Sequence, residues 1–203
     1  MRKLGAGVLA VVAVLMSAAA ALAQEKSGQE KSQEKSQEKS SVVYGLSIPD
    51  RVGSLLYRQT VDYESRSPGL GYGLRFTGPP GWIVDVYLYD LGLKAIPADA
   101  GSDLMKKQLA RAKGDVFELG KRGTYANVSE KGDFTIPETG KARFICTSFA
   151  YFRGERVDIE VDSFLCLTSW NNKFVKLRMT GPKGTISRSD ANNFADAWTV
   201  LLR

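Results

Sequence analysis

The chain has 203 residues, a formal net charge of +6 and no histidine. The lack of histidine excludes Ser-His-Asp and Cys-His catalysis and the usual zinc sites. Arg2 and Lys3 carry two of the positive charges, and the other lysines and arginines are scattered among carboxylates instead of gathered into a basic patch. We therefore expect no nucleic-acid partner, and we assign no catalytic, metal-binding or cofactor-binding residue.

The first 23 residues are predicted to be a secretory signal peptide. Arg2 and Lys3 precede an apolar run that starts at Leu4, and the segment ends in Ala21-Leu22-Ala23, an A-x-A cleavage site. An uncleaved membrane anchor is the less favoured alternative, because this run is at the short end of the roughly 20 apolar residues that a span needs. Cleavage after Ala23 predicts a periplasmic or secreted protein without a transmembrane segment.

Residues 24–40 form a low-complexity spacer in which Gln-Glu-Lys-Ser occurs four times. The spacer has no apolar side chain and its charges balance, which predicts disorder. A transient helix or a weak tether to an anionic surface is the alternative. Residues 41–203 are predicted to form a single domain.

The first half of this domain reads as strands. Val42–Ile48 is an apolar lead, either an edge strand or a docked arm, and Leu55–Tyr63 is a predicted strand. Tyr72–Thr77 and Trp82–Tyr89 are predicted to form a hairpin around Gly78-Pro79-Pro80-Gly81, since proline fixes φ and glycine permits positive φ.

A helix is predicted to begin at Ser102, whose hydroxyl can cap free backbone N–H groups. Its apolar stripe contains Leu104, Met105, Leu109, Ala112 and Val116. The basic residues outside the stripe, which we interpret as a solvated helix surface, are Lys106, Lys107, Arg111 and Lys113.

The second half is organised around a meander. Tyr125–Phe134 is a weakly patterned strand, and Arg143–Phe152, Val157–Trp170 and Lys173–Thr180 follow as three consecutive strands. A closing helix opens at Ser187, which forms a capping-box pattern with Asp190, and is anchored by Phe194 and Trp198. The predicted fold class is α+β, an antiparallel sheet of about six or seven strands flanked by helices.

This order of elements over Leu55 to Leu202 resembles the Mog1/PsbP-like fold, an α/β sandwich. The resemblance also uses the Gly-Pro-Pro-Gly-Trp turn, the helix with Leu104, Met105 and Leu109, and the run from Phe164 to Arg178. It implies an accessory or binding role, as in small exported bacterial relatives, and carries over no functional residue.

Cys146 and Cys166 lie in neighbouring strands of the meander, and an exported protein with two cysteines suggests a disulfide. A tight two-residue turn at Gly154-Glu155 would instead place Cys146 opposite Ser163. A disulfide between Cys146 and Cys166 therefore needs a wider loop or a bulge, and two buried free thiols are the alternative.

Asp158, Glu160 and Asp162 share one face of the middle meander strand, where they could bind calcium or act as paired carboxylates. We favour a solvated acidic face, paired with basic residues across the sheet such as Lys176 or Arg178.

Two further patterns have alternative readings. Gly69, Gly71 and Gly73 could suggest a phosphate loop, but a strand and not a helix follows them. The aromatic residues of the first half fit core packing, or a ligand or partner surface if several are exposed together. They are Tyr57, Tyr63, Tyr72, Trp82, Tyr87 and Tyr89.

We therefore expect an exported, non-enzymatic binding or accessory protein of the bacterial envelope, acting on a protein or small ligand. The alternatives are a hydrolase that uses only carboxylates and a surface-associated envelope-stress factor tethered by its spacer.

Calcium tests the interpretation of the acidic face. We expect chelation of calcium to leave the thermal midpoint unchanged, because a solvated carboxylate row holds no structural ion. The measurement is thermal unfolding followed by circular dichroism with calcium or with a chelator. A large calcium-dependent shift would contradict the solvated-face interpretation.

Overall fold

The computed structural model describes residues 41–78, 81–153 and 159–203. The predicted signal peptide and spacer lie outside these residues, as do Pro79, Pro80 and Asp158. Within them, neither of the two helices combines the length and the apolar composition needed to cross a membrane.

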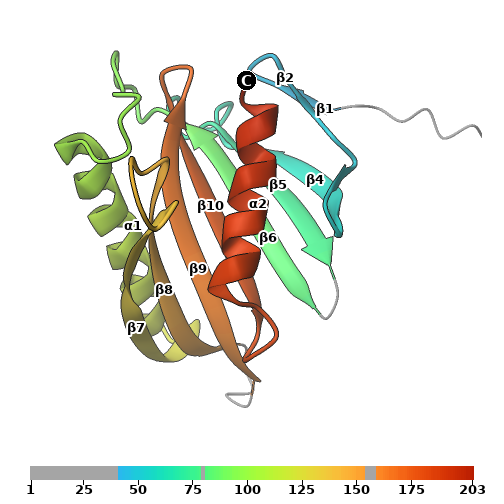
Figure 1. The fold of residues 1–203 in the computed structure, drawn as a ribbon, viewed down its shortest axis with the longest axis vertical. Coiled ribbons are helices and arrows are strands. Elements are labelled where there is room, and N and C mark those ends of the chain that lie inside the picture. Colours follow the sequence, from blue (N-terminus) through green and yellow to red (C-terminus); the bar gives the residue numbers. More distant parts are fainter. Residues whose placement is uncertain (1–40, 79–80, 154–158) are drawn as a thin grey trace, which may run out of the picture. The chain divides into compact units, whose positions relative to one another are not determined.

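The described residues form a mixed α+β structure built on an antiparallel sheet of eight strands (Figure 1). In spatial order the strands are β3 (Arg51–Val52), β4 (Leu55–Asp62), β5 (Tyr72–Gly78), β6 (Trp82–Tyr89), β10 (Lys173–Pro182), β9 (Ile159–Trp170), β8 (Phe144–Arg153) and β7 (Tyr125–Ile136). The expectation of six or seven strands misses β3, which is too short to show an alternating pattern.

The sheet consists of two meanders joined at their centre. Strands β3 to β6 and strands β7 to β10 each pair in sequence order, and β6 pairs with β10 to make one continuous sheet. The chain passes from β6 to the far edge strand β7 through helix α1 (Asp103–Lys121) and closes with helix α2 (Arg188–Leu201).

The two helices cover opposite faces of the sheet, so that a hydrophobic core lies on each side (Figure 1). On the α2 face, Trp198 is fully buried and its ring centroid lies 5.8 Å from that of Phe76 and 6.0 Å from that of Phe194. On the α1 face, Met105 and Val116 are buried against the sheet together with Leu165. Strands β9 and β10 lie between these two cores, which explains their high apolar content.

Both predicted helix starts are confirmed. Ser102 caps α1, where its hydroxyl accepts a hydrogen bond from the backbone N–H of Met105. Ser187 and Asp190 form the capping box of α2, in which the Asp190 carboxylate accepts from the Ser187 N–H at 2.8 Å. These side chains satisfy N–H groups that have no partner within the helix.

The apolar lead is a separate hairpin and not a strand of the main sheet. Strands β1 (Ser41–Val43) and β2 (Leu46–Ile48) pair with each other through Tyr44 and Gly45, which both have positive φ, as a two-residue hairpin turn requires. Val43, Leu46 and Ile48 are buried in the α2-side core. The hairpin therefore acts as a docked arm.

Trp198 is the largest fully buried side chain of α2. We expect Trp198→Ala to lower the free energy of unfolding by about 3–5 kcal/mol, because it removes a large apolar group and leaves a cavity between α2 and Phe76. The measurement is urea unfolding followed by circular dichroism.

Val200→Ala is the matched control on the same helix. Its side chain is 63% exposed, so we expect a change within about 0.5 kcal/mol. Equal effects of the two substitutions would contradict the packing of α2 described above.

Candidate functional site

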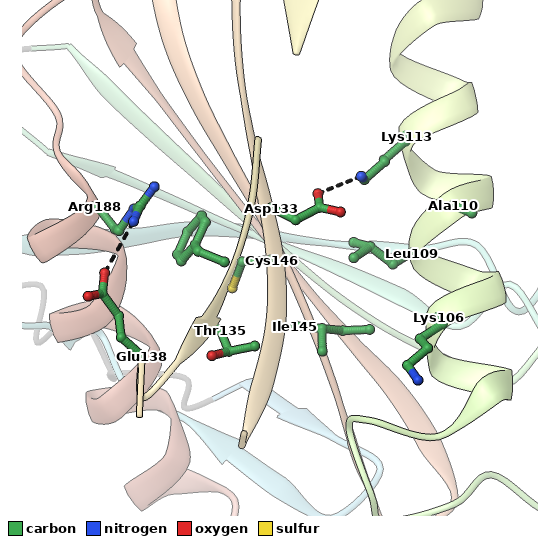
Figure 2. A pocket seen from close by; sticks show the side chains of 11 residues that line it. Lys106, Leu109, Ala110, Lys113, Asp133, Thr135, Glu138, Ile145, Cys146 and Arg188 are labelled. Atoms are coloured by element: carbon green, nitrogen blue, oxygen red, sulfur yellow. Dashed lines mark hydrogen bonds and ion pairs between the residues drawn. The ribbon is translucent and has the colours of Figure 1, made fainter. Parts of the chain in front are cut away.

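A groove of about 680 Å³ runs along the edge strand β7 (Figure 2). Helix α1 borders the groove on one side of β7 and the start of α2 borders it on the other. The lining residues are Lys106, Leu109, Ala110, Lys113, Asp133, Phe134, Thr135, Glu138, Ile145, Cys146 and Arg188.

The four groove residues of α1 lie on one face of the helix because of their spacing in the sequence. Lys106, Leu109, Ala110 and Lys113 follow one another at intervals of three, one and three residues, so they form one face of the helix. Two of the four are lysines that the sequence assigns to a solvated surface. Lys106 is exposed, as that interpretation expects, whereas Lys113 is half-buried and pairs with carboxylates of β7.

The floor of the groove is apolar on both sides of β7. Leu109 and Ile145 belong to the α1-side core, whereas Phe134 packs against the α2-side core. The Phe134 ring lies 6.2 Å from the ring of Phe164 and 4.5 Å from the Arg188 guanidinium carbon. The groove therefore borders the α1-side core on one side of β7 and the α2-side core on the other.

Ion pairs hold the rims of the groove. Lys113 Nζ donates to Glu130 Oε1 at 2.6 Å. Lys113 also pairs with Asp133 Oδ1, and Arg188 Nη1 donates to Glu138 Oε1 at 3.2 Å (Figure 2). Desolvation opposes the charge of Lys113, but the two carboxylates outweigh it and raise the lysine pKa. The charges of Lys113 and Arg188 are thus already compensated inside the protein.

Strand β7 is the edge of the sheet, so one side of its backbone has no strand neighbour among the described residues. Its first part is irregular, with register shifts between Ala126 and Ser129 and between Glu130 and Gly132. Bulges of this kind protect an edge from pairing with another strand. From Gly132 to Ile136 the register with β8 is continuous, and this regular part borders the groove.

The structure joins Cys146 and Cys166 in a disulfide, with the two residues directly opposite each other in the β8–β9 ladder. Of the two alternatives, the structure has the wider connection and not the tight turn that would place Cys146 opposite Ser163. Ser163 faces Phe149, because Arg153 pairs with Ile159 and the connection is wider than a two-residue turn. The residues of that connection lie outside the described part.

The acidic face has a structural role in the described residues. Glu160 Oε2 accepts from Lys183 Nζ at 2.6 Å, and Asp162 Oδ2 accepts from the Gly184 N–H at 2.8 Å. The expected partners Lys176 and Arg178 pair in register with Leu167 and Leu165, which point to the opposite face of β9 from Glu160 and Asp162. These two carboxylates therefore fasten the connection between β10 and α2.

No cluster of three or more His, Cys, Asp or Glu side chains suited to a metal ion occurs within the ranges that the structure covers. Asp158, the third residue of the acidic face, lies outside those ranges.

The glycine-rich segment before β5 makes hydrogen bonds within the protein and close backbone contacts. The Glu64 carboxylate accepts from the N–H groups of Gly69 and Gly71, at 3.0 and 2.8 Å. Gly71 has φ of 64°, and a Cβ atom there would lie 1.8 Å from the Leu88 carbonyl oxygen. Glycine is required at position 71 because the two backbones approach so closely.

No protein-family model matches this chain, and no curated protein matches it in sequence.

The disulfide predicts a stability difference. We expect the double variant Cys146→Ala, Cys166→Ala to unfold with a free energy lower by about 3 kcal/mol, because the bond closes a loop with a sequence separation of 20 residues. The measurement is urea unfolding, with mass spectrometry after thiol alkylation to report the bond in the wild type.

A reductant supplies the control for this prediction. It should lower the wild-type midpoint towards that of the double variant and leave the double variant unchanged. A wild-type protein that takes up two alkyl groups without reductant would contradict the bonded state.

Proposed function

We propose that this chain is an exported, non-enzymatic binding or accessory protein that takes an extended polypeptide segment into the groove along β7. The observation that carries the proposal is that this groove of about 680 Å³ lies along the regular part of an edge strand, whose outer side has no strand neighbour among the described residues. Such an edge can accept another strand through backbone hydrogen bonds.

The form of the groove supports an extended occupant. Successive side chains of a strand point to opposite faces of a sheet. A segment added beside Gly132–Ile136 would therefore direct alternate side chains towards Leu109 and Ile145 on one side and towards Phe134 on the other. Apolar side chains at both sets of positions would find an apolar surface.

The charges of the groove favour a segment that is not strongly charged. Lys113 and Arg188 already pair with carboxylates on β7 and beyond it, so an incoming charge would have to displace an internal partner. Lys106 lines the groove without an ion pair in the described part of the chain and can accept one acidic group at the rim.

The envelope location is part of this proposal and rests on the N-terminal pattern of residues 1–23. The Mog1/PsbP-like resemblance fits the same role, since the helix-flanked antiparallel sheet is compatible with that fold. The carboxylate-dependent hydrolase has less support, because Glu160 and Asp162 are engaged with Lys183 and Gly184.

A bulky residue in the groove tests the proposal. We expect Ala110→Trp to weaken binding at least about tenfold, because the indole would occupy the space beside β7. Lys107→Trp is the matched control, since Lys107 is exposed on α1 and lines no described cavity. The probes are short unstructured peptides that alternate apolar and polar residues, and binding is measured by fluorescence polarisation.

Methylation of the backbone nitrogens of the peptide distinguishes binding as an added strand from binding through side chains alone. Two versions of a binding peptide, N-methylated on one or the other set of alternate residues, should differ at least about tenfold in affinity, because one set faces β7. Hydrogen exchange should slow at Gly132–Ile136. Equal affinity of both methylated peptides, or binding that Ala110→Trp leaves unchanged, would refute strand addition at this groove.

A further inference from the structure

A second cavity lies on the other side of α1 and has a lysine in its wall. Lys176 stands in the middle of β10, where its neighbours in register are Tyr87 on β6 and Leu167 on β9. Its ammonium nitrogen lies 4.4 Å from the ring centroid of Tyr87 and 5.7 Å from that of Tyr89. Aromatic faces stabilise a cation only in part once it has left water.

Lys176 lacks the carboxylate partner that other lysines of the protein have. Lys113, Lys173 and Lys183 each form an ion pair, whereas Lys176 forms none with any residue that the structure describes. Burial lowers the pKa of the Lys176 ammonium group, and the more distant Asp115 opposes this only in part. The charged groups around it are Asp115 and Arg111 from α1, Asp85 from β6 and Arg178 from β10.

The cavity beside Lys176 measures about 220 Å³. This is below the roughly 300–1,000 Å³ of sites for drug-sized ligands, so it suits a small molecule and not a nucleotide. Three tyrosines, Tyr63, Tyr87 and Tyr89, form flat walls, and Arg111 adds a second cation from α1. Gln108 holds Tyr89 in place by donating to its hydroxyl at 2.8 Å.

The tyrosines remain neutral in this cavity. Burial raises the pKa of both Tyr87 and Tyr89 to about 12. Their hydroxyl groups therefore stay protonated at physiological pH and add no negative charge beside Lys176. The cavity thus combines two cations, Lys176 and Arg111, with one carboxylate, Asp115, and with tyrosine rings in its walls.

We propose that this cavity binds a small organic carboxylate with a flat apolar body, whose carboxylate pairs with Lys176 and Arg111. The ligand forms the direct ion pair with Lys176 that none of the described carboxylates makes, and its body packs against Tyr87 and Tyr89. This site is separate from the groove along β7, which lies beside the opposite face of α1. Its success or failure is therefore independent of peptide binding.

Benzoate is the probe, measured by calorimetric titration of the mature protein. We expect binding to the wild type, at least about tenfold weaker binding to Lys176→Met, and unchanged binding to Lys107→Met, which removes an exposed charge on α1. Benzyl alcohol, which has the ring without the carboxylate, should bind at least about tenfold more weakly than benzoate. Absence of benzoate binding at millimolar concentration, or equal binding to Lys176→Met, would overturn the proposal.

The pH dependence has a defined sign. Benzoate pairs with the protonated lysine, so its affinity should fall as pH rises through the lowered pKa of Lys176, which lies below the ordinary lysine pKa. The unfolded chain binds more protons than the folded chain between the folded and the ordinary lysine pKa, so wild-type stability should increase with pH in that window. Lys176→Met should unfold at a higher urea concentration than the wild type at neutral pH, because it removes a half-buried cation without an ion pair in the described residues.

Pulse acetylation of the wild-type protein gives a test that needs no variant. The unprotonated Lys176 amine attacks acetic anhydride, forms an amide and releases acetate. Benzoate should protect Lys176 and leave Lys107 unprotected, as read by peptide mass spectrometry. Equal labelling of Lys176 with and without benzoate would contradict binding at this cavity.

Discussion

The pairing of β6 with β10 is the contact on which the rest of the structure depends. It runs from Tyr89 opposite Phe174 to Ile83 opposite Thr180 and converts two separate meanders into one sheet. Without it, neither α1 nor α2 would have a sheet wide enough to cover, since each core draws residues from both meanders. The same pairing places Lys176 beside Tyr87, so the lysine-lined cavity is a direct product of the join.

Helix α1 gives the protein two different surfaces from one element. Its buried stripe fixes it to the sheet, and the residues on either side of that stripe line the groove and the smaller cavity. The charges on the two sides differ in kind. Lys113 is compensated by Glu130 and Asp133, whereas Lys176, across the helix, lacks an ion-pair partner in the described chain. The compensated charge of Lys113 links α1 to β7, whereas Lys176 has no such link to another element in the described chain.

Local patterns in the sequence predict the helices and strands well, but they predict poorly which residues face one another across strands. The caps at Ser102 and Ser187, the meander strands and the anchors Phe194 and Trp198 follow from spacing of a few residues, and the structure has them where expected. The register of β8 with β9 depends on the width of one connection, and the sequence pattern leaves open whether Cys146 lies opposite Ser163 or Cys166. The groove could not be predicted from the sequence. Lys106, Thr135 and Arg188 line it together only because tertiary packing brings α1, β7 and α2 to the same edge of the sheet. The helical spacing of Lys106, Leu109, Ala110 and Lys113 is the one local signal that points to a shared face.

The central join also sets the order in which this chain can acquire its structure. Strand β6 lies in the first half of the described chain and its partner β10 is the last strand, so their contact closes a long loop, which is entropically costly and slow. Until β10 is available, β6 presents an open edge that carries Val84, Val86 and Leu88, all fully buried in the finished fold. An incomplete chain is therefore exposed to aggregation at its own centre. Loss of the C-terminal segment would do more than remove a helix, because it would uncover the middle of the sheet.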